Sequence, residues 1–96
     1  MSGTKLEINM KRLPVQFEFN ERAIKIVKNK LIERLKRKGN GSFYSRHESF
    51  GIIAEEFDEL WDELRSNNKQ KFKNELIDVA VACLFSIACL EAKTME

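Results

Sequence analysis

The stretch LIDVAVACLFSIACL, residues 76–90, decides the fold of this 96-residue chain. Of its fifteen residues, only Asp78 and Ser86 are polar. On a helix this run is apolar around its whole circumference, and such a helix lies buried among other elements. The run is also shorter than the ~20 residues that cross a bilayer. It therefore predicts the central helix of a helical bundle and no membrane span.

The second half of the chain predicts two antiparallel helices. One helix covers residues 46–66 and begins after Ser45, with Glu48 three residues further on, as is typical of a capping box. The polar triplet 66–68 ends this helix and opens another over residues 69–92. Because the connection is short, the two helices should be neighbours. The apolar seam of the first helix consists of Phe50, Ile53, Phe57, Leu60 and Leu64.

A further helix is predicted over residues 21–38, with Asn20 as its N-cap and the Gly-Asn-Gly sequence at 39–41 as its end. Residues 1–20 alternate loosely between apolar and polar, which predicts irregular structure or short strands. We therefore expect an all-α helical bundle that forms a single domain over residues 1–96. A chain with three helices can hardly cover the all-apolar helix on every side. We therefore expect oligomerisation to complete the bundle, as a homodimer or homotetramer.

Charge is divided unequally between the two halves of the chain. Residues 1–46 carry 12 Lys and Arg against 4 Asp and Glu, whereas residues 47–96 carry 5 against 11. The helix over residues 21–38 holds eight of the twelve Lys and Arg residues of the first half. One interpretation is a non-catalytic interaction module that binds nucleic acid, nucleotide or an acidic partner through this helix. No aromatic interleaving or recognition motif favours sequence-specific contact with DNA, so nucleic acid is the less favoured partner.

The two cysteines, Cys83 and Cys89, are six residues apart in the apolar run. On a helix they lie about 9 Å apart along the axis, which is too far for a disulfide. Free thiols are typical of a reducing compartment. The beginning of the chain also has no secretory signal pattern, so the sequence predicts a cytoplasmic location.

Acidic residues of the two antiparallel helices fall into matching register. Glu56 and Glu59 form an i, i+3 pair on one helix, and Glu75 and Asp78 form another on the next. If the turn centres on Asn67, Glu59 faces Glu75 and Glu56 faces Asp78. Four carboxylates are then expected at the same height on two adjoining helices.

Four carboxylates would suit a hard cation. Oxygen ligands in this number favour Mg²⁺ or Mn²⁺ over zinc, and helical bundles build metal sites from acids on facing helices. The alternative is that each acidic pair is a solvated helix face. Asp78 within the apolar run argues against that alternative, because an unpaired buried charge is costly. Glu59 lies far from the apolar seam of its helix, so it must face a second packing surface to join the others.

These same residues carry a resemblance to a known family. Residues 55–59, Glu-Glu-Phe-Asp-Glu, followed by residues 75–78, Glu-Leu-Ile-Asp, resemble the Glu-Glu-x-x-Glu … Glu-x-x-Asp signature of the MazG-like all-α nucleotide pyrophosphohydrolases. The similarity extends over roughly residues 47–90 and does not include residues 1–20. It implies hydrolysis of nucleoside triphosphates between the α and β phosphates, giving the monophosphate and pyrophosphate.

The resemblance also implies roles for individual residues. Glu56, Glu59, Glu75 and Asp78 would be Mg²⁺ ligands, and Glu55 would orient water or bind a second ion. Two features depart from the family pattern: the chain leaves no room for a fourth helix after residue 90, and the basic residues that members carry beyond the acidic blocks have no counterpart. A member that binds nucleotide and metal without turnover is therefore a second alternative.

Four other side chains are candidates for contacting substrate. Lys71 and Phe85 share one stripe of their helix with the acidic pair, where Lys71 could reach a phosphate and Phe85 could stack on a base. Trp61 borders the apolar seam, and His47 stands at a helix start. The alternatives are a solvent-exposed Lys71, packing for Phe85 and Trp61, and capping or exposure for His47.

Overall fold

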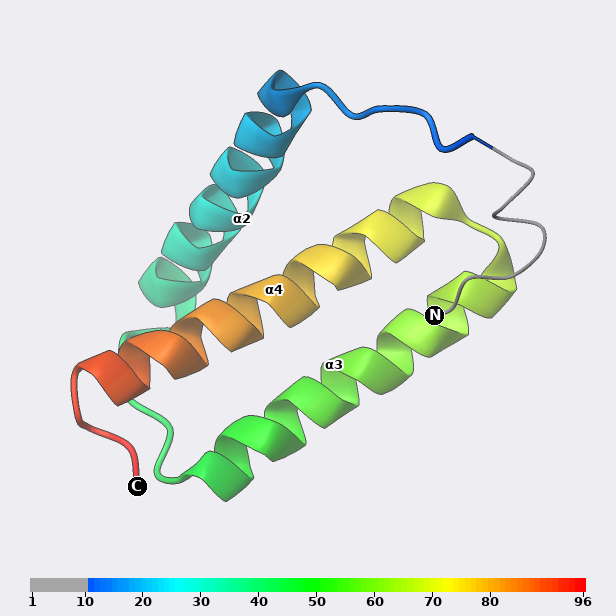
Figure 1. The fold of residues 1–96 in the computed structure, drawn as a ribbon. Helices are drawn as coiled ribbons and strands as arrows, with labels where there is room; N and C mark the ends of the chain where they lie inside the picture. Colours follow the sequence, from blue (N-terminus) through cyan, green and yellow to red (C-terminus); the bar gives the residue numbers. More distant parts are fainter. Residues whose placement is uncertain (1–10) are drawn as a thin grey trace.

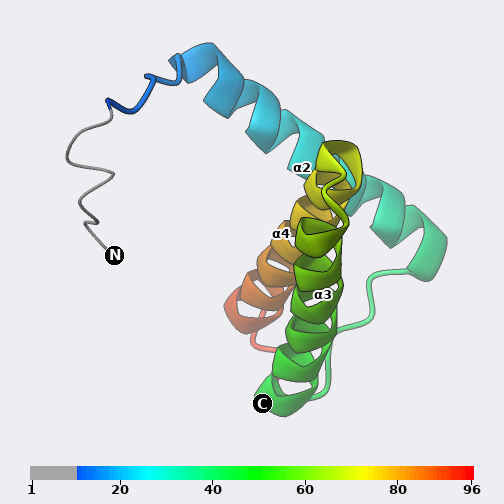
Figure 2. The same ribbon diagram turned by 90° about the vertical axis from the view of Figure 1, so that its right-hand side faces the viewer.

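The computed structural model describes residues 11–96, and this part of the chain consists of three α-helices without strands. They are α2 (Phe17–Lys38), α3 (Arg46–Ser66) and α4 (Lys69–Glu91). Helices α3 and α4 form an antiparallel hairpin, and α2 packs against α4 (Figure 1). Both α2 and α3 pack against α4 and not closely against each other, so α4 is the central helix; in a perpendicular view α2 crosses the hairpin at a steep angle (Figure 2). The prediction of an all-α bundle with an antiparallel pair is confirmed.

Helix α2 begins four residues earlier than the sequence predicts. It starts at Phe17, so residues 17–20 are helical and Asn20 is not its N-cap. The N-cap is Gln16, whose side chain makes no capping hydrogen bond. Glu18 in the first turn provides an acidic group near the positive end of the helix dipole, which favours the earlier start. The alternation predicted over residues 1–10 lies outside the described residues.

Glycine and asparagine residues fix the ends of the helices. Gly39 ends α2 with φ +82°, a conformation that favours glycine, and its N–H donates to Leu35. Asn67 ends α3 in the left-handed region at φ 59°. Asn68 then caps α4, because its side-chain oxygen accepts a hydrogen bond from the N–H of Lys71 at 3.0 Å. The turn therefore centres where the sequence predicts.

The predicted cap of α3 is also present. The Ser45 side chain accepts a hydrogen bond from the N–H of Glu48 at 3.2 Å. Glu48 reaches back one residue further than a standard capping box requires and accepts from the N–H of Tyr44 at 2.6 Å. Both ends of the antiparallel pair are therefore set by local side-chain hydrogen bonds.

The hydrophobic core lies at the end of the bundle where α2 ends and α3 begins. Phe43 and Phe85 meet edge to face with ring centroids 5.2 Å apart, and Cys89 completes the buried cluster. Residues after α4 return to this end, where the carbonyl of Glu96 accepts from the N–H of Arg46 at 2.7 Å. The partly buried side chains around the cluster are Leu31, Leu35, Ile52 and Met95.

Many large apolar side chains lie outside this core. Sixteen are exposed in the described part of the chain, among them Phe57, Trp61 and Leu64 on α3. Helix α4 is central but not fully covered, since Leu84 and Ile87 are 42% and 56% exposed. No helix within residues 11–96 is long and apolar enough to cross a membrane.

Candidate metal site

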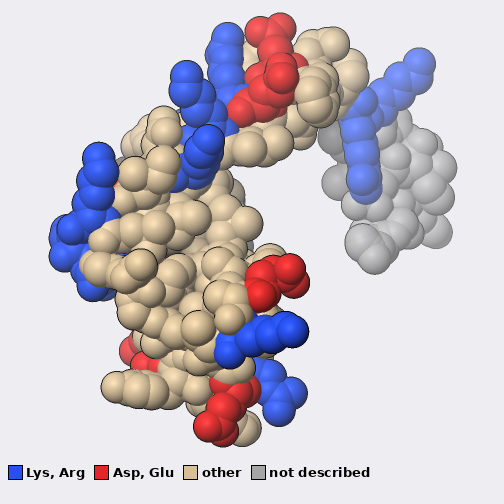
Figure 3. All heavy atoms as spheres, turned by 90° about the vertical axis from the view of Figure 1, so that its left-hand side faces the viewer, with Lys and Arg blue, Asp and Glu red and all other residues tan. Residues whose placement is uncertain are grey.

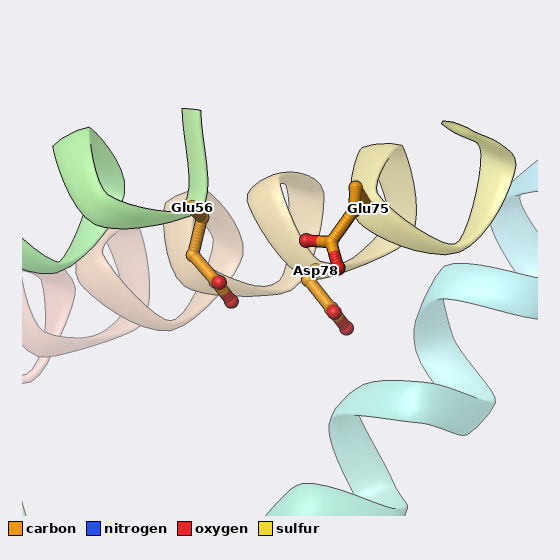
Figure 4. Close-up of side chains that lie close together, drawn as sticks. All are labelled: Glu56, Glu75 and Asp78. Atoms are coloured by element: carbon orange, nitrogen blue, oxygen red, sulfur yellow. The ribbon is translucent and has the colours of Figure 1, made fainter. Parts of the chain in front are cut away.

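Three carboxylates from two helices converge near the middle of the hairpin. Glu56 of α3 and Glu75 and Asp78 of α4 each place an oxygen within 4.8 Å of the other two. All three are half-buried. Glu56 and Asp78 extend in the same direction from their helices, and Glu75 stands one turn along α4 beside Asp78 (Figure 4). The register predicted from the turn at Asn67 therefore brings together three of the four expected side chains.

Two of these acids, Glu56 and Glu75, have raised pKa values. The pKa of Glu56 rises to about 7, first because burial disfavours its charge, then because it shares a hydrogen bond with Glu59 and faces the charge of Asp78. The pKa of Glu75 is also raised, by burial first and then by repulsion from Asp78 and Glu59. Near neutral pH the cluster therefore favours binding of a positive species, either a proton or a cation.

One carboxylate oxygen has an unmet hydrogen-bonding need. Oε2 of Glu75 is buried and has no hydrogen-bond partner. Such an atom costs roughly 1–3 kcal/mol when nothing compensates for its lost hydration. A hard cation would compensate, and carboxylate oxygens are the ligands that Mg²⁺ and Mn²⁺ prefer. Neighbouring ligand oxygens of one octahedral Mg²⁺ lie ~3 Å apart, so the three side chains would have to draw closer together to hold such an ion.

The fourth predicted ligand, Glu59, lies beside this cluster and not within it. Its side chain is exposed, and it reaches the group through its hydrogen bond with Glu56. Among residues 11–96 no second packing surface covers it. Glu55 is exposed on α3 and is also outside the three-residue group.

The four side chains predicted to contact substrate do not gather at the cluster. Phe85 is 7% exposed and packs on Phe43, so its ring belongs to the core and is not available for stacking on a base. Trp61 is half-exposed, with the Arg65 guanidinium 5.8 Å from its ring centroid. His47 and Lys71 are both exposed, near the first turns of α3 and α4 respectively.

A pocket beside the cluster reveals basic residues that the sequence analysis did not assign to the site. It has a volume of about 290 Å³ and is lined by side chains from α2, α3 and α4. Glu56 and Asp78 line one side of it. Its apolar lining comes from Ile52, Val81 and Ala82, and the opposite wall is formed by the α2 side chains Lys30, Arg34, Arg37 and Lys38.

Their spacing is the one feature of the sequence that could have placed these basic residues at the site. Positions 30, 34, 37 and 38 recur at three- and four-residue intervals and so share one face of a helix. The helix carries other Lys and Arg residues as well, and basic side chains gather along it on the face that the space-filling view shows (Figure 3). That abundance conceals the stripe, because the sequence alone does not say which face of α2 meets α4.

Comparisons of the chain with protein-family models, with curated proteins and with solved structures find no match.

Proposed function

We propose that this protein is a cytoplasmic, Mg²⁺-dependent nucleotide pyrophosphohydrolase of the MazG-like kind, which cleaves nucleoside triphosphates to monophosphates and pyrophosphate. The observation that carries the proposal is the meeting of Glu56, Glu75 and Asp78 on the two antiparallel helices. These residues occupy the motif positions to which the resemblance gives metal-binding roles. The raised pKa of Glu56 and the unpartnered oxygen of Glu75 support cation binding at this place.

The chain's own residues would divide the work in a simple manner. Glu56, Glu75 and Asp78 hold the ion, which when bound neutralises phosphate charge and activates a water molecule. Glu59 lies beside Glu56 and can extend the ligand set. Glu55 remains a candidate for orienting the water. Such an arrangement provides the positioning and the charge neutralisation that phosphoryl transfer needs.

The products and the site of attack test this proposal. A panel of NTPs and dNTPs with Mg²⁺ should release pyrophosphate and not orthophosphate. In water labelled with oxygen-18, attack at the α-phosphorus breaks the bond to the bridging oxygen and leaves the label on the monophosphate. Label in the pyrophosphate would instead mean attack at the β-phosphorus and would refute the assigned reaction.

Substitution of a ligand should slow this reaction strongly. Asp78→Asn should lower turnover at least about a hundredfold, because a neutral amide holds the ion weakly and leaves phosphate charge uncompensated. Asp58→Asn is the matched control, since Asp58 is exposed on α3 and outside the cluster. An equal loss in both variants would point to a general effect of charge. Absence of hydrolysis with Mg²⁺ binding intact would favour the member that binds without turnover.

The proposal includes assembly as a homodimer or homotetramer. Its support is the large number of exposed apolar side chains, since a monomer seldom presents so much apolar surface to water. The rival function, a non-catalytic module that binds nucleic acid or nucleotide through α2, draws on the basic charge of that helix. It predicts binding that weakens steeply with salt and needs no Mg²⁺.

A further inference from the structure

The pocket beside the acidic cluster has walls of opposite charge that do not touch. Lys30, Arg34, Arg37 and Lys38 line it from α2, and two carboxylates line it from α3 and α4. In the described part of the chain, no ion pair within 4.0 Å joins the two walls. Flexible basic side chains ordinarily close on nearby acids, so a pocket with unpaired charges of both signs is suited to a ligand that carries both a cation and anionic groups.

The basic wall includes one guanidinium held in place without an acidic partner. Arg34 is half-buried, and its guanidinium carbon lies 5.1 Å from the ring centroid of Phe85 and 5.9 Å from that of Phe43. These cation–π contacts fix its position while leaving its N–H groups free of any carboxylate among residues 11–96. A fixed guanidinium fork is suited to binding two phosphate oxygens at once.

The other cations of the wall differ in availability. Lys30 is already paired with Glu33 at 3.0 Å, and this hydrogen bond lowers the pKa of Glu33. Arg37 and Lys38 are exposed and have no ion pair within 4.0 Å among the described residues. Arg34 and Arg37, three residues apart on one face of α2, are therefore the two guanidinium groups available to a ligand in the pocket.

We propose that Arg34 and Arg37 bind the phosphate chain of a metal-bound polyphosphate whose cation is held on the opposite wall by the carboxylates. The cation half of this inference rests on the proposed function. The resemblance implies basic residues beyond the acidic blocks, whereas here they precede the blocks and come from α2. A pocket of about 290 Å³ is at the lower limit for small-molecule sites, so it encloses the phosphate chain and leaves the nucleoside outside.

A general polyanion surface is the competing explanation. The outer face of α2 carries further cations, such as Arg22, Lys25 and Lys28, which do not line the pocket. A nucleic acid would contact both faces through its phosphates, and each lost cation would weaken binding by a similar amount. A polyphosphate chain in the pocket depends on Arg34 and Arg37 and not on the cations outside the pocket.

The experiment is calorimetric titration of the full chain with inorganic tripolyphosphate in the presence of Mg²⁺. We expect Arg37→Gln to weaken binding about tenfold or more, as loss of a charge-assisted hydrogen bond does. Arg22→Gln is the matched control, because it removes the same charge from the same helix outside the pocket, and it should change affinity less than twofold. Arg34→Gln should resemble Arg37→Gln.

Arg34 also touches the core, so a second variant separates binding from folding. Arg34→Lys keeps the charge and the stem but loses the fork, and it should weaken tripolyphosphate binding about as much as Arg37→Gln while circular dichroism and the melting temperature stay near the parent values. Equal affinities in the Arg37→Gln and Arg22→Gln variants, or equal losses for tripolyphosphate and for duplex DNA across all variants, would overturn the inference.

The same titrations distinguish this inference from the proposed function. Mg²⁺ binding alone should survive Arg37→Gln and disappear in Glu75→Gln. If tripolyphosphate binding depends on Arg34 and Arg37 but no nucleotide is hydrolysed, the phosphate wall stands and the enzymatic proposal falls. If hydrolysis occurs at the parent rate in Arg37→Gln with an unchanged KM, the enzymatic proposal stands and the phosphate wall falls.

Discussion

Among single residues, Glu75 combines two properties that seldom occur together. One of its oxygens is buried without a hydrogen-bond partner, and its pKa is raised by burial and by the charge of Asp78. Both properties disfavour the free carboxylate and favour a bound cation. Removing the charge of this residue is therefore the most direct way to ask whether a metal ion binds.

Divalent metal should raise the melting temperature of the protein through this residue. At Mg²⁺ concentrations a hundredfold above the dissociation constant, mass action adds about 2.7 kcal/mol, which corresponds to roughly 10 °C or more for a domain of this size. Glu75→Gln should abolish the shift and leave the protein helical. Thermal melts with Mg²⁺ or with a chelator measure it, and a shift that persists in Glu75→Gln would place the metal elsewhere.

Glu56 makes the stability of the metal-free protein depend on pH. Because its pKa of about 7 in the folded state exceeds the ordinary value of 4.5, the folded state binds the proton more tightly than the unfolded chain. This contribution is fully present below pH ~4.5 and is lost as the pH rises through about 7. The melting temperature in chelator should therefore fall between pH 5 and pH 8.

Glu56→Gln should flatten that dependence and raise the melting temperature at pH 8, since the amide carries no charge at any of these pH values. With Mg²⁺ present the parent protein should reverse its trend, because an ionised Glu56 is available to the ion above pH 7. A parent protein that becomes more stable with rising pH in chelator would contradict the assigned crowding of acids.

Among the helices, the register of α3 against α4 depends on two asparagines with different tasks. Asn67 adopts φ 59°, and Asn68 caps α4. Asn68→Ala should lower stability by about 1 kcal/mol through loss of the cap. Asn67→Gly should be neutral or slightly stabilising, because glycine adopts the left-handed conformation at no steric cost. Urea unfolding curves of the two variants check this, and equal losses would show that the caps do not govern the turn.

The sequence predicted the hairpin well because its signals are local. The cap at Ser45, the polar triplet at 66–68 and the apolar run each act within a few residues, and the register arithmetic followed from them. The start of α2 was wrong by four residues, since no side chain caps it and Asn20 is a plausible but unused cap. Helix termini without a capping hydrogen bond leave little trace in a sequence.

The residues of the candidate site that the sequence did not predict correctly are placed by tertiary packing. Which face of α2 meets α4 is decided by packing around Leu31 and Leu35, and that choice directs Arg34 towards the pocket. Phe85 was placed among substrate contacts because it shares a stripe with Asp78, yet the core end of α4 requires an aromatic to meet Phe43. Side chains on one face of a long helix can therefore lie in different environments, one in the core and another at the candidate site.

For the molecule as a whole, the question is what covers its apolar surface. No large side chain in the described residues is fully buried, and exposed apolar residues include Phe57, Trp61 and Leu64, which share one face of α3. Light scattering should report a dimer or tetramer at micromolar concentration. A well-behaved species of 11.2 kDa would refute assembly.

A charge placed on this face should dissociate the assembly. We expect Trp61→Glu to shift the population towards monomer, because a carboxylate would have to be buried at the interface. Leu13→Glu is the matched control, since Leu13 is 88% exposed and precedes α2. Size-exclusion chromatography with light scattering compares the two variants. Equal behaviour would exclude the α3 face as the contact between copies.

The stacking of Arg34 on Phe85 has a consequence for how such a chain can vary. The Phe85 ring contacts both the Arg34 guanidinium and the Phe43 ring, so one ring serves both the interior and the pocket wall. Phe85→Leu keeps an apolar side chain of similar size but removes the aromatic face that attracts the cation. Substitutions at positions 34 and 85 should therefore be epistatic. Whether a substitution at one position is neutral should depend on which residue occupies the other.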